Sequence, residues 1–244
     1  MGVHAKDFYY QAAQGVRGTS AVIKFGSNLD IDTLTEPETI WSTGGLYDFP
    51  LTAAQLSVTS TSANDTAAGT GARKVVIQGL DENYKEIEEE LTLNGLTPVL
   101  STSTKWLRVY RMRVSEAGSG EVNAGSIATA VGSADGAVIL AGDGQTQMAV
   151  YTVPAGKTAY LKTFSGAVVR GTASSEASLG LYVRKNGVRR LIQEISVGTQ
   201  GANTYNKEYI IPIKIEEKTD IYVECIEVSA NNSAVFSNFS LVLE

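Results

Sequence analysis

The chain has 244 residues, 43% of them hydrophobic and 19% charged, which is enough for a buried core in one or two domains. A single cysteine excludes a disulfide framework and any multi-cysteine zinc site, and the single histidine, His4, lies in a terminal segment, so we expect no catalytic triad. Twenty basic and 26 acidic residues give a net charge of -6, which disfavours direct binding to nucleic acid.

Residues 1–50 show no long alternation of apolar and polar residues, and we expect an N-terminal extended arm or a lid over the next module. No apolar run in the chain approaches a signal-peptide core or the ~20 residues of a membrane helix, so we expect synthesis in the cytoplasm and no membrane contact. The aromatic residues of this segment are candidate interface residues: Phe8, Tyr9, Tyr10 and Trp41. For Trp41, burial in the core is an equal alternative.

Residues 51–145 are predicted to form a first β module, because short runs rich in β-branched and aromatic residues are separated by turn signals. The predicted strands lie near 54–61, 73–80, 84–93, 98–101, 105–114 and 121–130. The glycine-containing stretches at 132–136 and 141–145 predict a linker. Glu86, Glu88 and Glu90 share one face of a strand, and a solvated face is favoured over a cation site there.

Residues 146–244 are predicted to form a complete C-terminal β-sandwich. Its seven predicted strands lie near 148–153, 158–169, 178–185, 188–197, 205–215, 220–228 and 234–243. Asn186 and Gly187 predict a type I′ hairpin, and residues 154–157 (PAGK) predict a type II turn with proline at its first central position. The fold class is therefore all-β, with two tandem β-sandwich, jelly-roll-like modules.

Alternation within two of these strands predicts which side chains face the core. Ile221, Val223 and Cys225 are expected inside, with Tyr222 and Glu224 outside. The same pattern places Ile211, Ile213 and Ile215 inside, opposite Lys214 and Glu216. Packing is thus the expected role of Cys225.

Two groups of arginines are further candidate interface residues: Arg108, Arg111 and Arg113 in the first module, and Arg184, Arg189 and Arg190 in the second. Together with the glutamate strand, they predict surfaces of opposite sign, which favour self-association or docking on an acidic lattice. A solvated face without a partner is an equal alternative.

Residues 39–130, over a third of the chain, carry a resemblance through three segments: 39–50 (TIWSTGGLYDFP), 62–81 (SANDTAAGTGARKVVIQGLD) and 91–95 (LTLNG). In this order they resemble a segment of virion structural proteins of tailed bacteriophages. Residues 151–161 (YTVPAGKTAYL) are also similar to the opening of β-sandwich modules in phage decoration and fibre proteins.

The resemblance implies a non-enzymatic structural component of the particle, without catalytic, cofactor-binding or metal-binding residues to transfer. We expect a capsid decoration or cement protein that stabilises the phage head at capsomer junctions. Its expected partners are further copies of itself, in a trimer, and the major capsid protein or other virion proteins; its expected location is the virion, after synthesis in the host bacterial cytoplasm. A tail- or fibre-associated structural or adaptor protein is the alternative, and a carbohydrate-binding β-sandwich is the third hypothesis.

Overall fold

The computed structural model describes residues 10–11, 14–15, 18–169, 174–201 and 203–244. Its strands are β1 (Ser20–Ile31), β2 (Glu38–Thr39), β3 (Leu56–Ser60), β4 (Ala72–Asp81), β5 (Glu86–Thr92), β6 (Val99–Leu100), β7 (Trp106–Ala117), β8 (Ile127–Val131), β9 (Ala134–Ile139), β10 (Val150–Thr152), β11 (Ala159–Val169), β12 (Glu176–Lys185), β13 (Val188–Gly198), β14 (Thr204–Ile215), β15 (Asp220–Val228) and β16 (Ser233–Leu243). The predicted all-β fold is confirmed. No helix within the described ranges is long and apolar enough to cross a membrane.

The chain forms two compact units. The terminal unit contains the described residues of Met1–Phe25, Leu29–Ile40 and Ala149–Glu244, and the central unit contains Gly26–Asn28 and Trp41–Met148. Each is described by itself below.

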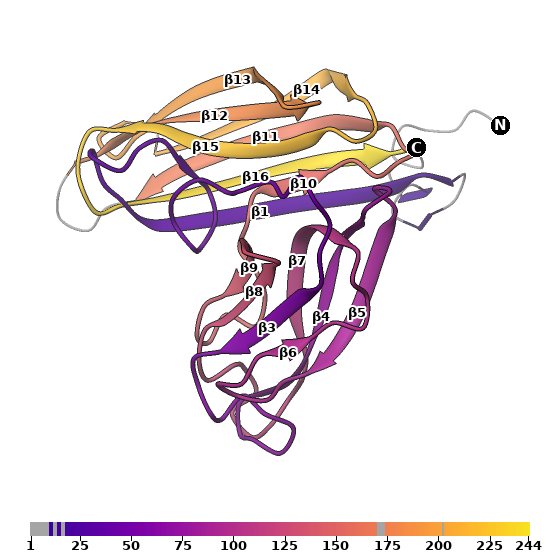
Figure 1. The fold of residues 1–244 in the computed structure, drawn as a ribbon. Coiled ribbons are helices and arrows are strands. Elements are labelled where there is room, and N and C mark those ends of the chain that lie inside the picture. Colours follow the sequence, from indigo (N-terminus) through magenta and orange to yellow (C-terminus); the bar gives the residue numbers. More distant parts are fainter. Residues whose placement is uncertain (1–9, 12–13, 16–17, 170–173, 202) are drawn as a thin grey trace. The chain divides into compact units, whose positions relative to one another are not determined.

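The terminal unit is a β-sandwich of two sheets (Figure 1). One sheet has the order β1-β16-β11-β14, and the other has the order β10-β15-β12-β13, with β2 also paired to β15. β2 and β10 pair with β15 one after the other and can be counted together as the second of eight strand positions. The positions then follow the order 1-8-3-6 in the first sheet and 2-7-4-5 in the second, which is the strand order of a jelly roll. The core between the sheets includes Leu161, Phe164, Leu181, Val223 and Phe239, all at most 1% exposed.

The organisation along the chain differs from the tandem arrangement expected from the sequence. Residues 20–31 are not an arm over the first module, because they form β1 beside β16 of the terminal unit. Residues 41–148 are inserted between β2 and β10, the two short strands that pair with β15. The expected linker at 132–136 is also wrong, since it contributes to the hairpin of β8 and β9.

The central unit contains two sheets, with the strand orders β6-β3-β8-β9 and β5-β4-β7. Their strands are labelled β3 to β9 in Figure 1. The largest fully buried side chains include Leu56, Ile77, Trp106, Met112 and Ile127, which come from both sheets. Because inward residues of two sheets fill one interior, this unit also packs as a sandwich.

Local turn chemistry explains two connections in the terminal unit. Asn186 and Gly187 have φ values of 52° and 80°, which confirms the predicted type I′ hairpin between β12 and β13. In the turn before β11, Gly156 has a φ of 77° and the Lys157 N–H donates to the Pro154 carbonyl at 3.2 Å. Glycine therefore occupies the expected second central position, whereas the proline is the first residue of the turn and not its first central residue.

Candidate interaction surfaces and pocket

The aromatic candidates of the N-terminal segment differ in their placement. Phe8 and Tyr9 lie outside the described residues, and Tyr10 is 73% exposed. Trp41 is buried; its indole N–H donates to the Gly45 carbonyl at 3.0 Å, and its ring meets Tyr47 edge-on at 5.1 Å. Trp41 therefore belongs to the core of the central unit and offers no surface to a partner.

Arg108 is also buried, although the sequence placed it in a basic surface group. Its guanidinium donates to the carbonyls of Pro50 and Leu107 and lies 5.5 Å from the ring centroid of Phe49 and 5.8 Å from that of Tyr84. A guanidinium that is buried among carbonyls and aromatic faces holds the packing of its unit together. We therefore assign Arg108 a structural role.

Glutamates of β5 and arginines of β7 lie on the same face of the sheet β5-β4-β7, on either side of neutral residues of β4. Antiparallel pairing forms three cross-strand rows, each of which joins a glutamate of β5 to an arginine of β7 through one residue of β4: Glu86–Leu80–Arg108, Glu88–Gln78–Arg111 and Glu90–Val76–Arg113. Directly paired residues share a sheet face, and strands two apart are about 10 Å apart. We call this the striped face.

The striped face corrects the expectation that the glutamates and these arginines form separate surfaces of opposite sign. Glu86, Glu88 and Glu90 are exposed, as predicted, while Arg111 is half-buried and Arg113 is exposed. Among the residues that the structure describes, no group of three or more potential metal ligands occurs. The face therefore carries both signs, which suits docking against a complementary pattern of charge.

One end of the striped face is neutralised by an ion-pair network. The Lys74 ammonium lies 2.9 Å from the Glu116 carboxylate and 4.0 Å from that of Glu90, and the Ser115 hydroxyl donates to Glu90 at 2.8 Å. The hydrogen bond between the side chains of Lys74 and Glu116 raises the pKa of Lys74 and lowers that of Glu116. The Glu90 carboxylate is therefore held by internal contacts, while the exposed side chains of Glu86, Glu88 and Arg113 carry the charges that this face presents to a partner.

The second basic group separates onto two faces of the terminal unit. On the outer face of its sheet, Arg189 pairs with Glu224 and lies over the Tyr182 ring at 3.8 Å, while Arg184 lies 3.7 Å from Asp220. Arg190, the next residue of β13, lines a pocket elsewhere. Successive side chains of a strand point to opposite faces, so neighbouring arginines in the sequence do not form one patch here.

Tyr222 and Glu224 are buried on the outer face beside the exposed Arg189, which corrects the prediction that they face solvent. Both are 4% exposed, and the Tyr182 and Tyr222 rings stack with centroids 5.7 Å apart. Burial raises the pKa of Tyr222 to about 12, and burial also raises the pKa of Glu224 against the opposing effect of Arg189. Tyr222 and Glu224 therefore lie beside the exposed Arg189 and offer almost no surface of their own to a partner.

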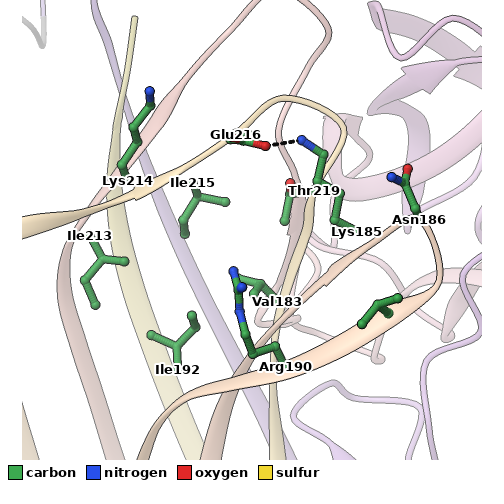
Figure 2. Close-up of a pocket in the computed structure, with 11 residues that line it drawn as sticks. Val183, Lys185, Asn186, Arg190, Ile192, Ile213, Lys214, Ile215, Glu216 and Thr219 are labelled. Carbon is green, nitrogen blue, oxygen red and sulfur yellow. Dashed lines mark hydrogen bonds and ion pairs between the residues drawn. The ribbon is translucent and has the colours of Figure 1, made fainter.

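The pocket lies at the β13 and β14 side of the jelly roll, with a volume of about 490 Å³. Its apolar walls are Val183, Val188, Ile192, Ile213 and Ile215, and Lys185, Asn186, Arg190, Lys214, Glu216 and Thr219 complete it. Figure 2 shows Arg190 pointing into the space beside Ile192 and Val183, Lys214 pointing away, and Lys185 joined to Glu216. We call this the edge pocket.

Arg190 gives the edge pocket its chemical character. Within the described part of the chain, no hydrogen bond or ion pair joins its guanidinium to another residue, because the nearby Glu216 carboxylate is held by Lys185. Both Lys185 and Arg190 lower the pKa of Glu216, with the Lys185 hydrogen bond as the largest cause. The pocket therefore suits an aliphatic group that lies beside a negative charge.

The sequence prediction missed the edge pocket because it misassigned the inward face of β14. Ile215 is buried as predicted, but Ile213 is half-buried and Ile211 is 84% exposed. A bulge in β14 shifts the alternation between these residues. Pro212 was the available signal, since proline inside a strand marks an edge or a bulge.

No family model matches this chain, and no curated protein matches it. Among solved structures it is similar to the PBSX exported protein XepA, with 10% identity and a TM-score of 0.20 over 90% of this chain and 86% of that one. It is also similar to chains from the infectious bursal disease virus Gt strain and from the T13 particle of that virus. Both are 9% identical over 92% of this chain, covering 72% and 71% of theirs, with TM-scores of 0.20 and 0.21. At these scores, none of the similarities carries an argument about function.

Proposed function

We propose that the protein is a non-enzymatic structural component of a virus particle, a capsid decoration or cement protein that binds at capsomer junctions of a tailed-phage head. The striped face carries the proposal, because its exposed glutamates and Arg113 present both signs of charge to a complementary lattice. Such contacts are individually weak at a surface, but repetition over a shell makes attachment firm.

The jelly-roll strand order of the terminal unit supports this proposal and is also compatible with a second one. Jelly rolls occur in viral capsid domains and also in lectin domains. The order is therefore compatible with the phage-like segments at 39–50, 62–81 and 91–95, and it keeps carbohydrate binding as a second candidate. Binding of the purified protein to a glycan array would favour that second candidate.

Copy number on the particle tests the proposal directly. Quantitative mass spectrometry of purified particles should find hundreds of copies for a decoration protein, since capsomer junctions repeat over the whole head. A dozen copies or fewer would assign the protein to the tail or fibre instead, and absence from the particle would refute a virion role altogether.

A matched pair of variants tests whether the striped face makes the attachment. Glu86→Lys with Glu88→Lys should reduce binding to stripped particles by about tenfold or more, because two attractive contacts become repulsive. The control changes the same amount of charge at two other exposed positions of the central unit, Asp135→Lys with Asp143→Lys. Equal binding by both variants would contradict the assignment of the striped face.

A further inference from the structure

Strand β14 leaves its sheet at one point. The pairs Leu161↔Ile213 and Thr163↔Glu208 leave one residue, Lys162, on the β11 side and four residues, 209–212, on the β14 side. Extra residues on one strand form a bulge, which bends that strand out of the ladder. The Lys162 ammonium donates to the Tyr209 carbonyl at 3.5 Å, so the base of the bulge is held in place.

The bulge presents two adjacent isoleucines to solvent. Tyr209 is buried and anchors the segment, whereas Ile210 is 95% exposed and Ile211 is 84% exposed. We call Ile210 and Ile211 the knob. Pro212 follows directly and has no N–H to donate, so this part of the edge is a poor template for adding a strand. Recognition at the knob would therefore use its side chains.

The edge pocket lies next to the knob along the same strand, since Ile213 and Ile215 line it. Its volume of about 490 Å³ is roughly three times the ~150 Å³ cavity that holds a benzene ring, so it has room for two aliphatic side chains. Arg190 points into it with no carboxylate paired to it in the described residues. Glu208 stands two residues before Ile210; its side chain is 75% exposed, and its carboxylate lies 4.0 Å from the Lys162 ammonium of the same chain, which leaves it accessible to a further cation.

We propose that the knob of one copy inserts into the edge pocket of a second copy of this chain, where Glu208 of the inserting copy meets Arg190. The occupant is a second copy because one chain carries both halves of the contact: exposed isoleucines beside a carboxylate, and an aliphatic pocket beside a guanidinium. Closed symmetry leaves no knob and no pocket exposed. This inference adds a contact between copies to the proposed function, and any role of that contact on a particle rests on the proposed function.

Sedimentation of the purified full-length chain tests the inference. The wild type should sediment as an oligomer, and Ile210→Asp with Ile211→Asp should sediment as a monomer; the milder Ile210→Ala should weaken association by about tenfold to a hundredfold. Leu34→Asp is the matched control, since Leu34 is 92% exposed elsewhere in the terminal unit, and it should stay oligomeric. A monomeric wild type, or a knob variant that remains oligomeric, would overturn the proposal.

A charge exchange tests whether the edge pocket is the partner of the knob. Arg190→Glu and Glu208→Arg should each weaken association by about tenfold, and the two together should restore it, because the pair is re-formed with reversed signs. Failure of the double variant to recover would remove the pocket from the contact. Binding of the striped-face variants to particles is measured separately, so failure of this contact and failure of the proposed function give different results.

Discussion

Asp65 is the residue whose loss we expect to cost the central unit most stability. It is fully buried, and its carboxylate accepts hydrogen bonds from the N–H groups of Ala72 at 2.7 Å, Ala124 at 2.8 Å and Gly125 at 2.9 Å, and from the Ser60 hydroxyl at 2.6 Å. It thereby joins the start of β4 to the loop that precedes β8. In Asp65→Ala, the buried N–H groups of Ala72 and Gly125 lose their acceptor.

Each buried donor left without an acceptor costs about 1–3 kcal/mol, so we expect Asp65→Ala to lower the free energy of unfolding by about 2–6 kcal/mol. Both tryptophans of the chain, Trp41 and Trp106, are buried in the central unit, so urea unfolding followed by tryptophan fluorescence reports on that unit. Asp143→Ala, which removes one exposed hydrogen bond from Gln147, is the control and should change stability by less than about 0.5 kcal/mol. A loss below about 1 kcal/mol for Asp65→Ala would refute the reasoning.

Two further predictions concern the terminal unit. Because burial raises the pKa of Glu224 above its ordinary value of 4.5, its contribution to stability is fully present below pH 4.5 and is lost as the pH rises through the folded-state pKa. The stability of the wild type relative to Glu224→Gln, measured by thermal unfolding, should therefore fall as the pH rises above 4.5, and a constant difference would contradict this. Burial raises the pKa of the Cys225 thiol to about 12, so a thiol reagent at pH 8 should label it only after urea is added; rapid labelling of the native protein would contradict its burial.

Most strands from residue 54 onward could be predicted, because each is a local pattern between turn residues; β9 was missed, since its glycine-containing start was interpreted as a linker. The predicted runs near 158–169, 188–197 and 220–228 correspond to β11, β13 and β15. β1 was missed because its partner, β16, lies about 200 residues away, and because its apolar residues do not alternate regularly. The nested organisation depends on that single long-range pairing, which no local pattern encodes.

The candidate surfaces were harder to predict, because residues close in the sequence of a strand face opposite ways. Arg189 and Arg190 were grouped by sequence, yet one packs on Tyr182 and the other lines the edge pocket. Conversely, Glu88 and Arg111 were placed on separate surfaces, yet pairing through Gln78 brings them into one row. Which charges meet is decided by register, and register depends on bulges that shift it by one residue or more.

The two ends of the inserted segment meet within each unit. In the terminal unit, the Ala149 N–H donates to the Ile40 carbonyl at 2.9 Å, and in the central unit Trp41 pairs with Met148. Chain ends that are hydrogen-bonded neighbours can be joined by a short loop without moving any strand. We therefore expect the jelly roll to fold when residues 41–148 are replaced by a short Gly-Ser linker.

The same geometry predicts that residues 41–148 fold alone, because their ends are already paired through Trp41 and Met148. Each piece should give a β-type circular dichroism spectrum and a cooperative thermal transition. The jelly-roll piece should also keep the self-association of the full chain, since the knob and the edge pocket both belong to the terminal unit. An unfolded jelly-roll piece would mean that β1 and β10 need the inserted unit in order to reach their places beside β16 and β15.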